Sequence, residues 1–198
     1  KNGCFDAQSP RPDSLMPFPK KYAELAARTR VSAGFVVVIA FLWLARPTPA
    51  SLAVGGLIGA VGVAIRAWAA GHLAKNQRLA CSGPYAHVRN PLYVGTLLTG
   101  VGFAVAGAQL AIGIALVAFF LLFYLPVMGE EESHLAKILP GYAEYRSRVP
   151  RLWPALRPRY SEGPGFSQEL YIRNREYQAL AGYLATMGLL WSKHTLGW

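Results

Sequence analysis

The chain has 198 residues, of which 53% are hydrophobic and 15% are charged, and its mean hydropathy is +0.26. A typical soluble domain has about 25% charged residues. The deficit here is concentrated in windows with almost no charge, which favours an integral membrane protein over one soluble domain. The net charge is +10, and the basic residues lie beside the apolar runs. Membrane topology and anionic lipid headgroups require such a placement, so we do not expect nucleic acid as a partner.

Five apolar runs predict an all-α fold, a polytopic bundle of membrane helices. About 20 residues cross the hydrocarbon of a bilayer, so the second run is long enough, whereas the first is short. The fifth run is too short for an untilted span and has three possible arrangements: it crosses with a tilt, it docks on the other helices, or it lies in the interface. We favour a membrane-embedded helix. The runs are residues 31–45, 51–70, 92–106, 110–127 and 179–191.

The second run contains a glycine pattern and an arginine. Gly55 and Gly59 form a small-xxx-small pattern, which lets two helices approach closely. Arg66 either extends to the interface or faces a polar cavity, and we favour the interface. The short break at residues 107–109 joins the third and fourth runs into a tight helical hairpin.

The basic residues alternate between the loops. They are numerous at residues 20–30, 75–89 and 137–159, whereas Arg46 is the single basic residue between the first two runs and the hairpin has none. By the positive-inside rule, we expect a multi-pass protein whose N-terminal segment lies on the cytoplasmic side. The polar segments 75–93 and 129–151 then share that side.

These two polar segments are the candidate site. The first contains Gly-Pro-Tyr-Ala-His-Val-Arg-Asn-Pro-Leu-Tyr at 83–93, and the second begins with Glu130, Glu131 and Glu132. Carboxylates at the end of a span are costly without cationic partners or water, and near a helix C-terminus they are also disfavoured by the helix dipole. This placement indicates a function, and an exposed acidic helix start is the structural alternative.

The sequence GPYAHVRNPLYVG, followed by EEESHL and YAEYRSRVPRLWP, resembles the isoprenylcysteine carboxyl methyltransferase and phospholipid methyltransferase superfamily. These are small integral membrane enzymes that use S-adenosylmethionine and release S-adenosylhomocysteine. The resemblance implies a membrane methyltransferase core of four spans at residues 30–155. Residues 1–29 are then an N-terminal cytoplasmic segment, and residues 156–198 a C-terminal segment with a further membrane-associated helix.

The resemblance also implies a cytoplasmic cofactor pocket built from both segments. Glu131 corresponds to a glutamate near the reacting groups and Arg89 to the arginine before the Asn-Pro-Leu-Tyr tetrapeptide. We therefore expect these two to be catalytic, with Glu131 orienting the substrate and Arg89 positioning charge. The expected cofactor-binding residues are Lys75, Gln77, Arg78, Leu79, Ala80, Tyr85, Asn90, Pro91, Leu92, Tyr93 and Glu130.

The chemistry of the residues agrees with this interpretation. The cofactor S-adenosylmethionine has a carboxylate, an ammonium and an adenine. Arg89 and N–H groups at a helix start suit the carboxylate, and Glu130 or Glu131 suits the ammonium. Tyr85, Tyr93 or Trp153 suits the adenine. The same tyrosines also suit an interfacial aromatic belt, and Arg89 suits a lipid phosphate. An amine acceptor has to lose a proton, which Glu131 or His87 can take.

The acceptor is less well defined. Residues 126–128, Pro-Val-Met, stand where the eukaryotic carboxyl methyltransferases carry an arginine that holds the substrate. A lipid amine or another lipophilic small molecule is therefore as well supported as a prenylcysteine-type carboxylate on a lipidated substrate. We expect membrane lipids as partners and no metal. The alternatives are an NADPH-dependent membrane reductase of the sterol-reductase type and a non-enzymatic lipid-binding membrane protein.

Overall fold

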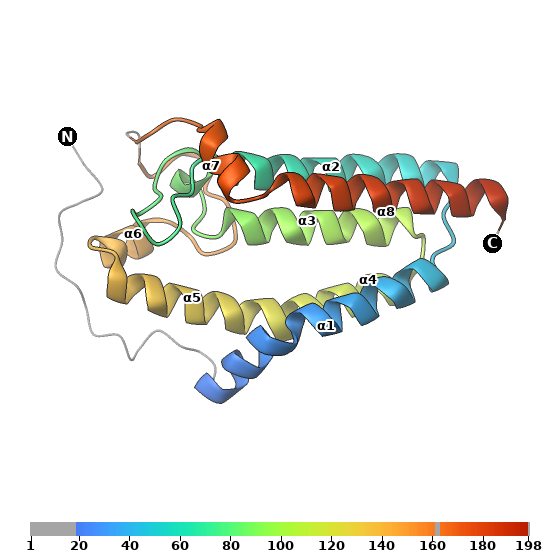
Figure 1. Ribbon diagram of the computed structural model, residues 1–198, viewed down its shortest axis with the longest axis horizontal. Coiled ribbons are helices and arrows are strands. Elements are labelled where there is room, and N and C mark those ends of the chain that lie inside the picture. Colours follow the sequence, from blue (N-terminus) through green and yellow to red (C-terminus); the bar gives the residue numbers. More distant parts are fainter. Residues whose placement is uncertain (1–18, 161–162, 198) are drawn as a thin grey trace.

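The structure, a computed structural model, describes residues 19–160 and 163–197 (Figure 1). The described residues form helices and no strand, which confirms the all-α fold. Most of the predicted N-terminal segment, residues 1–18, lies outside the described residues. The helices are α1 (Lys20–Leu44), α2 (Pro49–Ala70), α3 (Pro91–Ala106), α4 (Leu110–Phe119), α5 (Leu125–Ile138), α6 (Tyr142–Arg148), α7 (Gln168–Arg173) and α8 (Tyr177–Leu196), with a 3₁₀ turn η2 (Gly83–Ala86) and a π turn η3 (Phe120–Tyr124).

The helices form two groups that come together near the α3–α4 hairpin and diverge toward the opposite end. In Figure 1, α2, α3 and α8 run side by side, and α1, α4 and α5 form the opposite group. The segments 71–90 and 139–160, with α6 and α7, gather at one end, beside the C-terminus of α2 and the N-terminus of α3. The predicted hairpin between α3 and α4 lies at the other end. Segments 71–90 and 139–160 therefore come together although they are far apart in the sequence.

Local residue chemistry explains where the helices begin. The Thr48 side chain accepts a hydrogen bond from the Ser51 N–H, and the Ser51 side chain accepts one from the Thr48 N–H, so α2 begins with a capping box. Pro49 and Pro91 occupy the first positions of α2 and α3. Proline is favoured there because its fixed φ suits the helix and its missing N–H costs nothing.

The fourth apolar run continues without a break into the acidic segment. α4, η3 and α5 form one helix from Leu110 to Ile138. Pro126 lacks the N–H that would bond to the Leu122 carbonyl in a regular α-helix, and the Tyr22 hydroxyl of α1 donates to that carbonyl at 2.8 Å. Glu130, Glu131 and Glu132 therefore lie inside a helix that continues to Ile138, so the helix does not end beside them.

Glycines allow α2 and α3 to touch through their backbones. A Cβ atom on Gly55 would lie 2.3 Å from the backbone nitrogen of Ala106, and one on Gly102 would lie 2.4 Å from that of Gly59. No side chain fits at either position unless the helices separate. The close approach predicted from the small-xxx-small pattern is therefore confirmed.

α8 docks on the other helices, which is one of the three arrangements that the sequence left open. The Tyr183 hydroxyl donates to the Gly56 carbonyl at 2.6 Å, and its ring stacks on Phe103 of α3. Near the other end of α8, the Lys193 ammonium donates at 2.7 Å to the carbonyls of Leu42 and Trp43, the last turn of α1. At about 1.5 Å per residue, the 20 residues of α8 extend roughly as far as α2.

Within the part of the chain that the structure describes, two helices are long and apolar enough to cross a membrane, Pro49–Ala70 and Leu110–Ile138. Only 28% and 22% of their apolar windows are buried inside the protein. Their apolar surface therefore faces outward, as lipid contact requires, whereas the core helix of a soluble protein is mostly buried. Ser32–Leu44 and Pro91–Ala106 are apolar but shorter, so the expectation of four spans and their orientation stay predictions.

Candidate functional site

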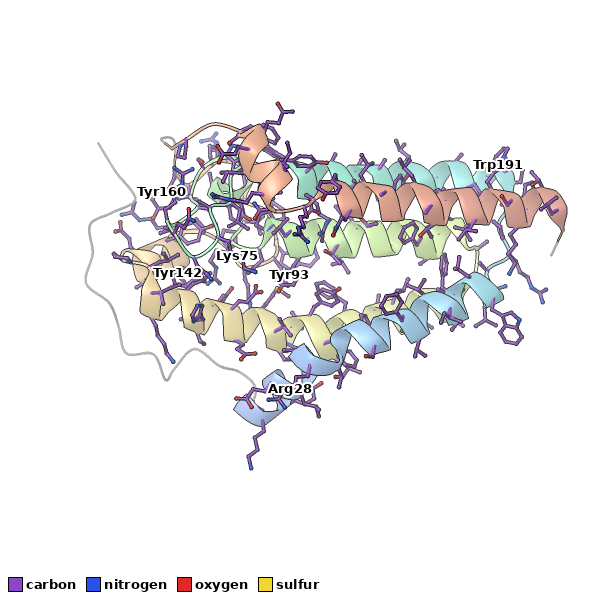
Figure 2. All side chains as sticks on the ribbon, viewed as in Figure 1. Arg28, Lys75, Tyr93, Tyr142, Tyr160 and Trp191 are labelled. Carbon is purple, nitrogen blue, oxygen red and sulfur yellow. The ribbon has the colours of Figure 1, made fainter. Side chains whose placement is uncertain are left out.

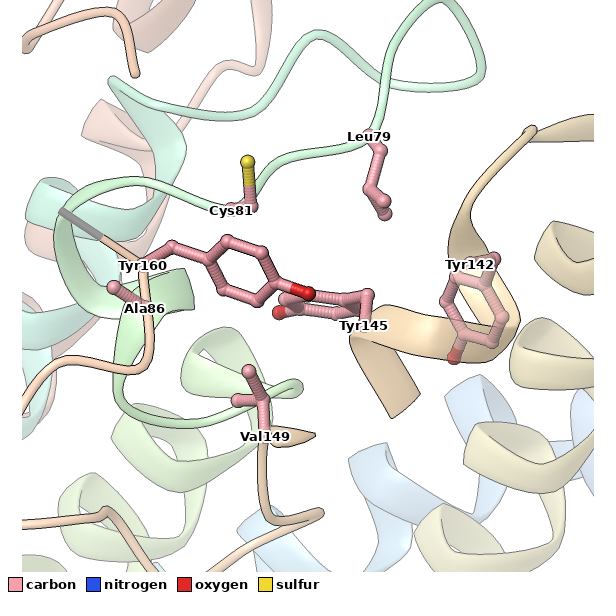
Figure 3. Close-up of a cluster of buried hydrophobic side chains, with 7 residues drawn as sticks. All are labelled: Leu79, Cys81, Ala86, Tyr142, Tyr145, Val149 and Tyr160. Carbon is pink, nitrogen blue, oxygen red and sulfur yellow. The ribbon is translucent and has the colours of Figure 1, made fainter. Parts of the chain in front are cut away.

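A buried aromatic cluster fixes the loop end of the bundle. Figure 3 shows Tyr145 of α6 and Tyr160 packed against the loop that carries Cys81 and Ala86. The Tyr145 hydroxyl donates to the Tyr85 carbonyl at 2.9 Å. Burial raises the pKa of the Tyr145 hydroxyl, so it stays protonated and acts as a donor. The cluster holds η2 against α6.

The segment that follows α6 runs along residues 86–89. The N–H of Arg89 donates to the Pro150 carbonyl at 2.9 Å, and the N–H of Ala155 donates to the His87 carbonyl at 2.9 Å. The His87 ring nitrogen Nδ1 lies 2.8 Å from the Ala155 carbonyl. His87 therefore ties two loops together and does not line the cavity described next.

A polar cavity of about 660 Å³ lies where the two predicted segments meet. Its size is within the usual range for small-molecule sites, about 300–1,000 Å³. Of the predicted residues, Gln77 and Glu130 do not line it, and Trp153 is 85% exposed elsewhere. The predicted residues that do line it are Lys75, Arg78, Leu79, Ala80, Tyr85, Arg89, Asn90, Pro91, Leu92, Tyr93 and Glu131.

Glu131 connects the two segments across the cavity. The Tyr93 hydroxyl of α3 donates to Glu131 Oε2 of α5 at 2.9 Å, and the Tyr93 ring meets Tyr124 edge to face. Burial raises the pKa of the Tyr85 hydroxyl, and the charge of Glu131 raises it further. Figure 2 shows Tyr93 and Lys75 at the end of the bundle where the loops gather. Glu131 is an exposed carboxylate within reach of a ligand.

Glu132, which the sequence did not single out as a site residue, is a buried carboxylate that binds two residues of the cavity lining. It accepts a hydrogen bond from Asn90 Nδ2 at 2.9 Å, and its oxygens lie 3.4 Å from the guanidinium groups of Arg89 and Arg151. The Glu132 side chain is 6% exposed. A buried carboxylate needs such partners, so Glu132 fixes the positions of Arg89 and Asn90.

Arg66 faces a polar cavity, which is the alternative that the sequence did not favour. Its Nε pairs with the buried carboxylate of Glu176, and its Nη1 donates to the Thr96 hydroxyl. Arg66 lines the polar cavity. Glu176 lies just before α8, far away in the sequence, and no local pattern marks the two as partners.

An apolar groove of about 380 Å³ adjoins the polar cavity. Side chains of α3 and of the α4–η3 helix line it, among them Leu97, Val101 and Leu116. Thr96 and Tyr124 line both the groove and the cavity. A polar compartment and an apolar one therefore meet at these two residues.

The polar cavity is mainly cationic. Its lining has the guanidinium groups of Arg66, Arg78 and Arg89 and the ammonium of Lys75, against the one carboxylate of Glu131. Lys75, Arg78 and Arg89 suit the carboxylate of a ligand such as S-adenosylmethionine, and Glu131 suits its ammonium. The tyrosines of the lining offer apolar faces for an adenine.

The chain matches the model of the phospholipid methyltransferase family over residues 62–141. The matched segment runs from α2 to the residue before α6 and includes Arg66, residues 75–93 and the three glutamates. The match confirms the resemblance drawn from the motifs. No solved structure matches the chain.

Two curated proteins are similar to part of the chain. A cobalt-zinc-cadmium resistance protein of Cupriavidus metallidurans is 37% identical over 105 residues, which is 50% of this chain and 49% of that protein. A nickel-cobalt-cadmium resistance protein of Alcaligenes xylosoxydans xylosoxydans is 29% identical over 110 residues, 54% of this chain and 52% of that protein. The chain therefore spans about half the length of these relatives.

Proposed function

We propose, from the phospholipid methyltransferase pattern of residues 62–141, that the protein is a membrane methyltransferase that uses S-adenosylmethionine and a lipophilic acceptor. The observation that carries the proposal is the meeting of two compartments at Thr96 and Tyr124. A polar cofactor and an apolar acceptor have to approach within bonding distance, and the protein offers each a compartment of matching polarity.

The cofactor would lie in the polar cavity. Its carboxylate would bind to cations of the 75–80 loop and to Arg89, and its ammonium to Glu131. Tyr85 and Tyr93 would pack against the adenine. When bound, S-adenosylmethionine supplies a methyl group on a sulfonium, and transfer of that group leaves the neutral thioether S-adenosylhomocysteine.

The acceptor would place its apolar tail in the groove and its nucleophilic atom near Tyr124. The contribution of the protein is mainly orientation, which can supply several kcal/mol of the barrier (about 7–11 at best). A carboxylate acceptor needs no base. An amine acceptor gives up a proton, and Glu131, held by the Tyr93 hydroxyl, is placed to take it.

The site would lie at the cytoplasmic surface of a four-span bundle. The basic residues at this end of the bundle support that side. In this arrangement the water-soluble cofactor enters from the cytoplasm, and the acceptor enters sideways from the lipid. The names of the two curated relatives state resistance to metal ions and no reaction, so they leave the acceptor open.

The test is ligand binding to the detergent-purified protein by calorimetry with S-adenosylhomocysteine, S-adenosylmethionine and NADPH. We expect micromolar binding of both adenosyl ligands, lost in Tyr93→Ala and kept in Arg28→Gln, an exposed residue of α1 that lines neither compartment. Binding of NADPH alone would support the reductase alternative. Binding of none of the three would support a non-enzymatic lipid-binding protein.

A further inference from the structure

We infer that Arg66 binds an anionic group of the acceptor and thereby makes the protein selective for anionic amphiphiles. The inference rests on the proposed function, since it concerns the acceptor side of that site. It assigns a specificity-determining role to a residue of α2 and supporting roles to Thr96 of α3 and to Glu176, which precedes α8.

The guanidinium of Arg66 is held in place but not saturated. Nε is engaged by Glu176 and Nη1 by Thr96, whereas Nη2 has no hydrogen-bond partner among the described residues. The side chain is 24% exposed and that of Glu176 is 8% exposed. A guanidinium presents its donors in a rigid fork that suits carboxylates and phosphates, so the end that carries Nη2 can receive an anion.

The position of Arg66 separates it from the other cations of the cavity. Its partner Thr96 lines the apolar groove as well as the cavity. None of the four cations of the cavity lines the groove itself, but among the described residues Arg66 is the one that bonds to a groove residue, Thr96. Through Thr96, Arg66 lies beside the junction of the two compartments, where the head of an amphiphile would leave the groove.

The ion pair with Glu176 explains how a cation is kept within the apolar helix α2. An arginine within a span is costly unless it is paired, and the mostly buried Glu176 carboxylate supplies the pairing while it leaves Nη2 available. The Thr96 hydroxyl donates in turn to the Leu92 carbonyl at 2.9 Å, so Thr96 is fixed to its own helix. The guanidinium is thus oriented before a ligand arrives, which reduces the entropy lost on binding.

The test compares oleate with oleyl alcohol, which has the same tail and a neutral head, as radiolabelled probes on the protein in neutral detergent. Wild type is expected to bind oleate at least about tenfold more tightly, a difference of about 1.4 kcal/mol. Arg66→Gln combined with Glu176→Gln removes both charges, so that no unpaired buried carboxylate remains, and should abolish this preference. The single variant Arg66→Lys keeps a positive charge, so it should keep part of the preference for oleate. The surface variant Arg28→Gln should keep all of that preference.

Two further measurements make the result decisive. Acetate provides the anion without the tail, and displacement of oleate by millimolar acetate would contradict a site for amphiphiles. S-adenosylhomocysteine affinity, measured on the same samples, should stay within about twofold of wild type in every variant. Equal binding of the two amphiphiles by wild type, or a preference that persists in the double variant, would overturn the inference. Failure of the methyltransferase proposal would show instead as absent S-adenosylhomocysteine binding.

Discussion

Glu131 and Glu132 are neighbours in the sequence but have opposite environments. Glu131 is exposed and bonded to the Tyr93 hydroxyl, whereas Glu132 is buried among Asn90, Arg89 and Arg151. Successive residues of a helix point about 100° apart, so one glutamate faces the cavity opening and the next faces the protein. The two carboxylates therefore have separable effects on activity and on stability.

Substitution of Glu132 should mainly destabilise the protein. Glu132→Ala leaves two guanidinium groups without their buried counter-ion, and removal of one partner of a buried ion pair costs about 3–5 kcal/mol. We expect a clear fall in the melting temperature of the detergent-purified protein, followed by intrinsic fluorescence.

Glu131→Gln is the matched variant and should act on turnover. It keeps the shape and the acceptor oxygen for Tyr93, so the melting temperature should stay near that of wild type. Methyl transfer, measured with a radiolabelled methyl donor, should fall by about 10²-fold or more if Glu131 takes the proton of the acceptor. Equal melting temperatures for Glu132→Ala and wild type would contradict the buried role of Glu132.

The helices of the structure can be compared with the apolar runs that predicted them. The apolar runs gave the helices to within a few residues at α2, α3 and α8, because composition and proline positions mark them directly. α1 begins at Lys20, earlier than expected, because charged residues continue a helix beyond its apolar part. Part of the cavity lining followed from the motifs, whereas Arg66 and Thr96 were not among the predicted lining residues. The pairing of Arg66 with Glu176 depends on where α8 docks, and no local pattern encodes that contact.

The packing of α2 on α3 predicts a contrast between two glycines. Gly55→Ala places a Cβ against the backbone of α3, so the helices have to separate, and overpacking of this kind costs about 1–3 kcal/mol or more. Gly182→Ala on α8 meets no atom within 4 Å and should be neutral or stabilising by up to about 1 kcal/mol. Thermal unfolding of both variants checks this, and equal melting temperatures would contradict backbone contact between α2 and α3.

At the scale of the whole molecule, the two ends of the bundle differ in chemistry. One end carries the polar cavity and the loops, and the other carries the α3–α4 hairpin and the short connection between α1 and α2 (Figure 1). The basic residues are concentrated at the cavity end, which predicts that this end faces the cytoplasm. The relative positions of the loops already follow from the fold, so a single labelling experiment fixes the orientation of all of them.

That orientation can be measured with single cysteines in a background in which the native cysteines are replaced by alanine. Ala50→Cys lies in the exposed first turn of α2, and Lys137→Cys lies near the exposed end of α5. A membrane-impermeant maleimide should label Ala50→Cys in intact cells and Lys137→Cys only after permeabilisation. The reverse pattern would place the cavity on the outer face.

The contact between Lys193 and the last turn of α1 has a consequence for assembly during synthesis. The carbonyls of Leu42 and Trp43 leave the ribosome long before the ammonium that binds them at 2.7 Å. Until α8 arrives, these end groups of α1 have only water or lipid headgroups as partners. In a nascent chain stalled before Lys193, α1 should therefore already be held by η3 and α5, through contacts such as Tyr22 with Leu122, while its last turn is fixed only when α8 docks.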